Sequence, residues 1–249
     1  MLVKTKGVVV KSVNVGEYDR MITAITEDRG KIAFKVCGAN SMKNKNTSSC
    51  NMFTYSEFVL RQKGEHYTLD KGSSIHYPFR SSCDIDSVSL AAYFCQLCAD
   101  TSFDEESCRD IQRLLVNALF IIAKKDRPTD FIKGVFELRL LSRLGLKPLY
   151  DCCCNCRKSR KLLKKMYFDP VGGDLLCPDC RLDGRLELSA ECVELMWGAC
   201  EKEESKAYAV DVSPALLKEF SFAAESFLLN QLEKKYHTLD YYKSIKSRK

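Results

Sequence analysis

The chain has 249 residues, of which 45% are hydrophobic and 29% are charged. This composition is that of an ordinary globular protein, and the length allows one large domain or two smaller ones. Charges interrupt every apolar run well before the roughly 18 residues that a membrane span needs, and the first residues lack the long apolar segment of a secretory signal. We therefore expect a cytoplasmic protein without a membrane partner.

The formal net charge of +6 is concentrated in the first third of the chain. Residues 1–80 contain thirteen Lys and Arg against seven Asp and Glu, whereas residues 81–249 contain twenty-six of each. Such asymmetry suggests an anionic partner for the first third, although a solvated surface would give the same distribution.

Five segments within residues 1–80 are rich in β-branched and aromatic residues, as strands are. In one of them Ile32, Phe34 and Val36 alternate with residues of the opposite face, which is the period of a half-buried strand. The other four segments are Gly7–Lys11, Met21–Thr26, Phe53–Arg61 and His66–Asp70. Turn residues at 28–30 and 63–65 separate neighbouring segments, so we predict a small β-barrel or sandwich.

Helical spacing of apolar residues replaces this pattern from about Ser87. It predicts helices near residues 88–98 and 111–122, and a third from Pro128 that Gly145 ends. Two later serines, Ser189 and Ser213, are N-cap candidates for further helices, and the second of these reaches about Lys234.

The pattern therefore predicts a β domain at 1–80 and a helical domain at 81–235. Residues 236–249 are rich in lysine and arginine, and we predict that they form a basic, loosely ordered tail.

Two Cys-x-x-Cys pairs lie between the third and fourth long helices. They are Cys153 with Cys156 and Cys177 with Cys180, and twenty residues separate them. A two-residue spacer lets a tight turn aim two thiolates at one ion, and two such turns complete a tetrahedral zinc site. We predict one zinc ion per chain within a module at 150–182. The site would be structural, because four protein ligands leave no open coordination position.

Neighbouring cysteines leave alternatives open. Cys152 or Cys154 could replace Cys153 as a ligand, and the segment could instead be a metal-free loop or a redox pair. A further Cys-x-x-Cys pair, Cys95 with Cys98, lies on an apolar helical stripe and is predicted to belong to a core.

Basic residues in two regions are candidates for contacts with nucleic-acid phosphates. In the predicted barrel they are interleaved with aromatic residues, of which only one or two can stay outside the core and stack on bases. Residues 157–165 place six more cations in nine positions, although a solvated charge run is the alternative there. The predicted DNA-binding residues are Lys4, Lys6, Lys11, Arg20, Lys31, Lys35, Lys43, Lys45, Arg61, Lys63, Arg157, Lys158, Arg160 and Lys161.

We find no catalytic constellation in the sequence. The three histidines are isolated, and there is no GxGxxG, Walker or HExxH motif. Residues 16–20 pair two carboxylates with an arginine, which we interpret as a turn with local ion pairs. We therefore expect a protein that is not an enzyme and has no small-molecule substrate.

Several short segments stand in a specific order along the chain. They are Gly7–Val10, Gly16–Thr23, Gly30–Ile32, Gly38–Ala39, Phe53–Phe58, Tyr67–Leu69, Leu90–Phe94, Phe136–Leu141, Gly145–Pro148, the two cysteine pairs, Phe168 and Gly172–Gly173. In this order and spacing the sequence resembles the RecO family of bacterial DNA repair and recombination proteins. One departure is Arg157, which stands where the family often has glycine.

The resemblance implies an α+β multidomain fold, with an N-terminal five-stranded OB-fold barrel and an α-helical domain that carries the inserted four-cysteine zinc module. It implies binding of single- and double-stranded DNA and annealing of complementary strands. With RecR, such a protein promotes loading of RecA onto DNA coated by single-strand-binding protein, which places it at the nucleoid. The alternative is a zinc-containing adaptor that binds mainly protein and has no substantial DNA affinity.

Overall fold

The structure is a computed structural model that describes residues 1–41, 45–79, 84–103 and 108–247. The chain divides into two compact units, residues 1–125 together with 236–249, and residues 126–235. The predicted boundary at residue 80 falls within the first unit, after its last strand. Among the described helices, none combines the length and the apolar character that crossing a membrane requires.

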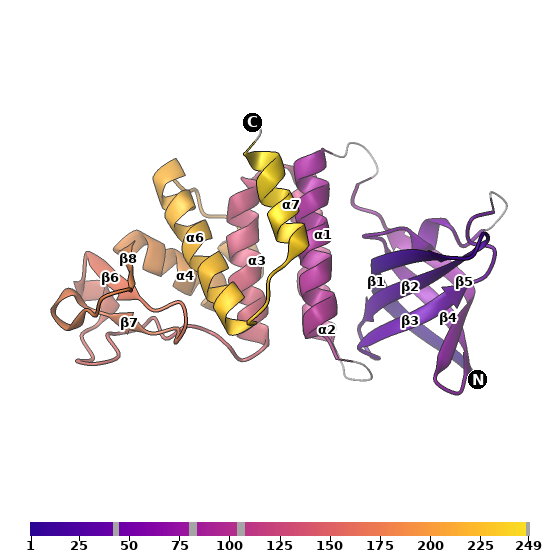
Figure 1. Ribbon diagram of the computed structural model, residues 1–249, viewed down its shortest axis with the longest axis horizontal. Helices are drawn as coiled ribbons and strands as arrows, with labels where there is room; N and C mark the ends of the chain where they lie inside the picture. Colours follow the sequence, from indigo (N-terminus) through magenta and orange to yellow (C-terminus); the bar gives the residue numbers. More distant parts are fainter. Residues whose placement is uncertain (42–44, 80–83, 104–107, 248–249) are drawn as a thin grey trace. The chain divides into compact units, whose positions relative to one another are not determined.

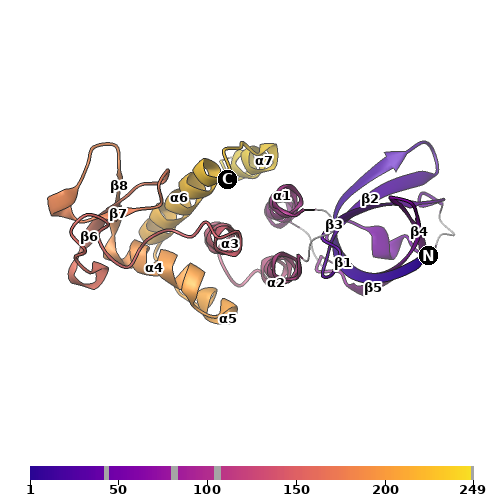
Figure 2. The ribbon, with the colours of Figure 1, turned by 90° about the horizontal axis from the view of Figure 1, so that it is seen from below.

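Five strands close a barrel in the first unit (Figure 1). They are β1 (Leu2–Val15), β2 (Asp19–Thr26), β3 (Lys31–Val36), β4 (Tyr55–Lys63) and β5 (His66–His76). Their order around the barrel is β1-β2-β3-β5-β4, and Figure 2 shows them around a common interior. Neighbours are antiparallel except β3 and β5, whose short parallel pairing completes the closure. This is the small barrel that the sequence pattern predicts, and the five-stranded OB-fold that the family resemblance implies.

Alternation along the strands fills the barrel with apolar side chains. Ile32, Phe34 and Val36 all point inward, as predicted, and the Phe34 and Phe58 ring centroids lie 4.9 Å apart. Strand β1 is longer than the predicted segment because it pairs with both β2 and β4, and a bulge between Val9 and Lys11 lies within it. Such a bulge bends a strand and lets it serve two neighbours of a closed barrel.

The first unit also contains helices α1 (Ile85–Thr101), α2 (Arg109–Lys124) and α7 (His237–Lys246). The last of these corrects the prediction of a loosely ordered tail. Leu239, Tyr242 and Ile245 follow helical spacing and are buried, and α7 packs beside α1 (Figure 1). Just before α7, the Tyr236 ring meets the Tyr93 ring of α1 edge-on at 6.0 Å. The high lysine and arginine content of residues 236–249 led to a tail being predicted there, although apolar residues recur at helical spacing.

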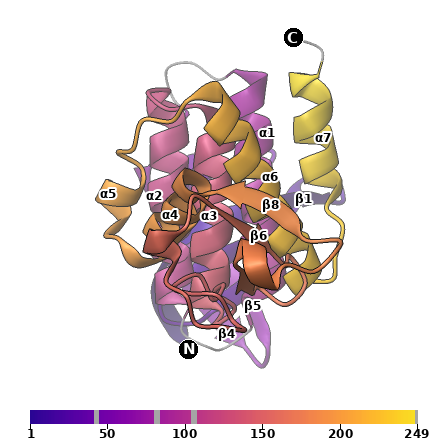
Figure 3. The same cartoon turned by 90° about the vertical axis from the view of Figure 1, so that its left-hand side faces the viewer.

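The second unit combines helices with a small sheet (Figure 3). Its helices are α3 (Thr129–Arg143), α4 (Ala190–Glu201), α5 (Glu204–Ala207) and α6 (Pro214–Gln231), and its strands β6 (Lys165–Phe168), β7 (Leu175–Leu176) and β8 (Leu186–Ser189) form a sheet in the order β7-β6-β8. Ser189 and Ser213 cap α4 and α6 as predicted, since their hydroxyls accept the backbone N–H of Cys192 and Leu216. The sequence did not predict the sheet, whose strands are two to four residues long.

A buried ion cluster joins α3 to α6. The Lys133 ammonium lies 3.0 Å from Glu137 and 3.1 Å from Glu225, and its side chain is only 2% exposed. Burial acts to lower the pKa of Lys133, but the two carboxylates outweigh it and raise the pKa. The lysine therefore stays charged inside the unit, and the carboxylates supply the charge compensation that burial demands.

The buried face of α7 generates a stability prediction. Tyr242→Ala should lower the free energy of unfolding of the first unit by about 3–5 kcal/mol, the range for losing a buried aromatic ring. Tyr241→Ala is the matched control, because that side chain is 55% exposed and its loss should change stability by less than about 0.5 kcal/mol. Denaturant unfolding followed by circular dichroism measures both. Equal stability of the two variants would show that α7 is not packed.

Candidate metal centre and nucleic-acid interface

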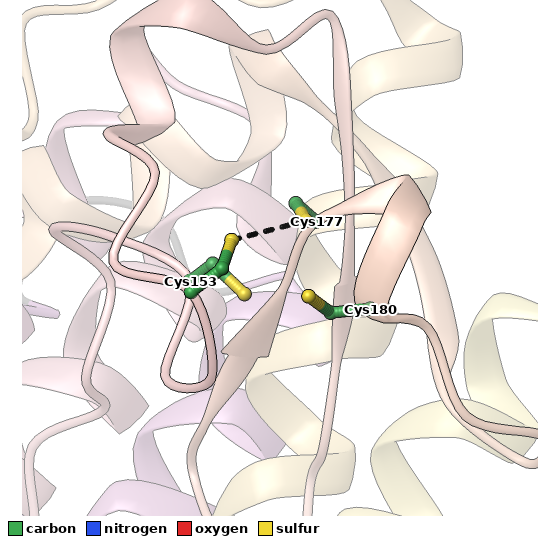
Figure 4. A group of neighbouring side chains, drawn as sticks. Cys153, Cys177 and Cys180 are labelled. Carbon is green, nitrogen blue, oxygen red and sulfur yellow. Dashed lines mark hydrogen bonds between the residues drawn. The ribbon is translucent and has the colours of Figure 1, made fainter.

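Four cysteine sulfurs converge within the module that carries the small sheet (Figure 4). The Sγ atoms of Cys153, Cys156, Cys177 and Cys180 all lie within 4.8 Å of one another, and those of Cys156 and Cys177 are 3.6 Å apart. Cys177 directly follows β7, and Cys180 ends the 3-10 helix η3 (Pro178–Cys180). These are the four residues that the sequence spacing selected as ligands.

Both cysteine pairs sit on tight backbone turns. The amide of Arg157 donates to the Cys153 carbonyl at 3.0 Å, and the amide of Cys180 donates to the Cys177 carbonyl at 3.1 Å. Arg157 has a φ of 61°, in the left-handed region that glycine adopts without strain. The departure from the family pattern at Arg157 therefore falls on a position whose backbone favours glycine.

The cluster has the size and the charge requirement of a metal site. A tetrahedral site with roughly 2.3 Å Zn–S bonds has sulfur–sulfur edges of about 3.8 Å, close to the 3.6 Å between the Cys156 and Cys177 sulfurs. Burial acts to raise the pKa of Cys153, but backbone N–H groups, including that of Cys156, lower it to about 6. The pKa of Cys180 is raised to about 12: a hydrogen bond from Asn155 lowers it, but the neighbouring sulfurs raise it by more. Holding all four cysteines as thiolates at this spacing would therefore require a bound cation.

The neighbouring cysteines lie outside this group of four. Cys154 is half-buried and packs against the cluster, and Cys152 forms an isolated bridge with Ser159. Burial raises the pKa of Cys154, and Asp174 raises it further. The geometry of the described residues therefore favours Cys153 over either substitute. Cys95 and Cys98 are fully buried in α1, as the apolar stripe predicts.

Several of the predicted barrel cations already have partners within the protein. Lys4 pairs with Glu57 at 3.3 Å, Lys35 with Asp19 at 2.8 Å and Arg61 with Asp70 at 2.8 Å. The Lys31 ammonium donates to the Ala99 carbonyl near the end of α1 at 2.9 Å. Lys31 thus ties α1 to the barrel, and its availability to phosphates is reduced.

Other predicted barrel cations are open to solvent. Lys6, Lys11, Lys45 and Lys63 are exposed and form no ion pair among the described residues. Lys43 lies outside the described residues. The open cations therefore include Lys11 on the outer face of β1, across from Thr23 of β2.

The cations beside the cysteine cluster likewise include exposed residues and residues that have partners within the protein. Arg157, Lys158 and Lys161 are exposed, and Lys158 lies 3.5 Å from Asp179. Arg160 is instead buried: its guanidinium pairs with Glu194 and lies 4.9 Å from the Trp197 ring centroid. The structure thus gives Arg160 a packing role that sequence alone did not indicate.

The turn between β1 and β2 belongs to a network that the sequence analysis missed. Residues 16–20 form the predicted turn, but their polar partners lie about twenty positions further along the chain. The Arg20 Nε donates to Asn40 Oδ1 at 2.7 Å, and the Gly38 amide donates to Asp19 Oδ1 at 2.9 Å. These segments meet because β2 pairs antiparallel with β3, with Arg20 opposite Val36, a register that the residue spacing alone did not give.

An OB-fold barrel followed by a helical region with a four-cysteine cluster defines the class of protein. The family model described as "Recombination protein O N terminal" matches residues 1–78, and that described as "Recombination protein O C terminal" matches residues 83–240. The chain belongs to the RecO family of DNA repair proteins.

Curated relatives match over nearly the full length. The chain is 29% identical to the DNA repair protein RecO of Acetivibrio thermocellus, covering 97% of this chain and 96% of the relative. It is 26% identical to the protein of that name from Caldicellulosiruptor saccharolyticus, covering 98% and 99% respectively. It is 28% identical to the DNA repair protein RecO of Dehalococcoides mccartyi, covering 93% of this chain and 91% of the relative.

The burial of Arg160 yields a prediction that separates packing from binding. Arg160→Ala should lower the free energy of unfolding of the second unit by about 1–2 kcal/mol, because it removes a charged hydrogen bond and a cation–π contact. Lys161→Ala, at an exposed neighbour, should leave stability unchanged. Trp197 is the single tryptophan of the chain, so its fluorescence reports unfolding directly. Unaltered stability of Arg160→Ala would contradict the packing role.

Proposed function

We propose that this protein is a recombination mediator that binds single- and double-stranded DNA and anneals complementary strands. Acting at the nucleoid with RecR, it would promote loading of RecA onto DNA coated by single-strand-binding protein. The observation that carries the proposal is family membership along nearly the whole chain. The open lysines on the barrel support it, because DNA affinity depends on phosphate contacts that release counterions.

The barrel is the proposed single-strand site. OB-folds bind oligonucleotides through the face of strands 2 and 3 and through the loops that flank it. Here β2 and β3 are neighbours in the barrel, and residues 31–45 contain four lysines and no acidic residue. The exposed cations at 157, 158 and 161 are a second proposed contact with the phosphate backbone.

We further propose that the four-cysteine cluster holds one zinc ion. Cys153, Cys156, Cys177 and Cys180 would be its ligands, and the soft thiolate set suits zinc. Bound zinc would supply charge compensation and cross-link the two turns, without chemistry on a substrate. Backbone hydrogen bonds around the cluster stabilise the module: the Cys153 amide donates to the Lys158 carbonyl, and the Cys154 amide donates to the Leu175 carbonyl.

The zinc proposal predicts the outcome of metal removal. Purified protein should contain about one zinc per chain, and Cys177→Ser should lose the metal and lower the unfolding temperature, because metal binding contributes folding free energy. Cys37→Ser is the control, since that exposed cysteine lies in the barrel unit. Zinc retention should also weaken on acidification, because protons compete for the thiolates. Metal-free protein with unchanged stability would contradict the proposal.

The DNA proposal predicts a steep salt dependence. Affinity for oligothymidylate should fall as salt rises, and Lys11→Glu/Lys45→Glu should weaken binding and reduce the slope of log K against log salt by about 0.7 per lost contact. Lys218→Glu/Lys235→Glu changes the net charge equally and lies in the other unit at exposed positions. Fluorescence anisotropy titrations at several salt concentrations measure both.

The same titration separates the mediator from the adaptor. Wild-type affinity that is unmeasurable at low salt would leave only the zinc-containing, protein-binding adaptor. Equal losses in both charge-reversal variants would mean that net charge, and not the barrel face, determines binding.

A further inference from the structure

The turn between β1 and β2 is rigidly held at one end of the barrel. Asn40 makes three hydrogen bonds to it: its amide donates to the Tyr18 carbonyl at 3.1 Å, its Nδ2 donates to the Glu17 carbonyl at 3.0 Å, and its Oδ1 accepts from Arg20 Nε at 2.7 Å. Gly16 takes a φ of 68° at the start of the turn. The turn conformation is therefore set before any ligand arrives.

Asp19 adds a second brace beside the first. Its carboxylate accepts the Gly38 amide at 2.9 Å and pairs with the Lys35 ammonium at 2.8 Å. Hydrogen bonds from Lys35 and Gly38 lower the pKa of Asp19, so the carboxylate remains charged and the brace remains intact at neutral pH. Its negative charge is also balanced locally by Lys35.

Tyr18 projects from this braced turn with 67% of its surface exposed. The four Phe and Tyr residues of the barrel strands, which are the other candidates for base stacking, are less available. Phe34 and Phe58 are completely buried in the barrel, and Tyr55 and Tyr67 are half-buried. Tyr18 is thus the exposed ring among these five candidates.

The strand surface next to Tyr18 is apolar with flanking cations. Val13, Val15 and Met21 are 46%, 43% and 37% exposed. Val13 pairs with Met21, and Met21 pairs with Lys35, so these side chains share the outer face of the barrel. Lys11 lies on the same face, two residues before Val13. An apolar strip with cations along it fits the bases and the phosphates of one extended strand.

We propose that Tyr18 is a base-stacking residue for single-stranded DNA, on a platform formed by the β1–β2 turn and the outer faces of β1, β2 and β3. The inference rests on the proposed function and deepens it by naming a contact that distinguishes unpaired bases from paired ones. A duplex hides the faces of its bases within the stack, so this contact favours single strands. The bracing by Asn40 and Asp19 reduces the ordering that binding would otherwise require.

The test compares Tyr18→Ala with wild type on two probes, oligothymidylate and an abasic strand of equal length. Tyr18→Ala should weaken binding to oligothymidylate about tenfold, the loss expected for one base stack, and should leave the abasic strand unaffected. The slope of log K against log salt should not change, because no phosphate contact is removed. Tyr18→Phe should bind like wild type, since it keeps the ring.

Tyr241→Ala is the matched control, an exposed tyrosine on α7 of the same unit. If wild type binds oligothymidylate and Tyr18→Ala binds it equally well, the stacking role is wrong while the proposed function stands. An equal loss on both probes would assign Tyr18 to the backbone and overturn the stacking role. If wild type binds neither probe, the proposed function itself fails.

Discussion

Closure of the barrel is the constraint on which the functional surface depends. The short parallel pairing of β3 with β5 completes a cylinder whose interior is filled mainly by apolar side chains, including the packed rings of Phe34 and Phe58. Strand residues that point inward are thereby committed to the core, and only those that point outward can meet a ligand. The β2–β3 pairing within the same barrel brings Asn40 to the turn at Tyr18, so the fold that buries most aromatic residues of the strands also braces one exposed ring.

The second unit depends on a different constraint. Strands of two to four residues make a small sheet, and a metal ion bound by the four converging sulfurs would cross-link the loops around β6 and β7. The exposed cations of residues 157–161 lie on one of these loops. Arg160, packed on Trp197, shows that a basic run beside the cysteine cluster can serve the fold as well as the surface.

The local features of this protein could be predicted from its sequence, whereas its long-range contacts could not. Alternation in residues 32–36 predicted a strand, and the spacing of the cysteine pairs selected the four residues whose sulfurs converge. The partners of Lys31 and Arg20 could not be predicted, because they depend on chain segments up to 68 residues away. Helix α7 was missed although Leu239, Tyr242 and Ile245 show its period, since the surrounding lysines dominated the composition.

Photochemical cross-linking tests the central claim, that the barrel face carries the single strand, most directly. The measurement uses an oligodeoxyuridylate with 5-iodouridine substituted along its length, irradiated in complex with the full chain, with adducts located by mass spectrometry. The account predicts adducts within residues 11–45, on the end of β1, on β2 and β3, and on the turn that carries Tyr18. Adducts confined to residues 126–235 would contradict it, because the DNA site would then lie in the other unit.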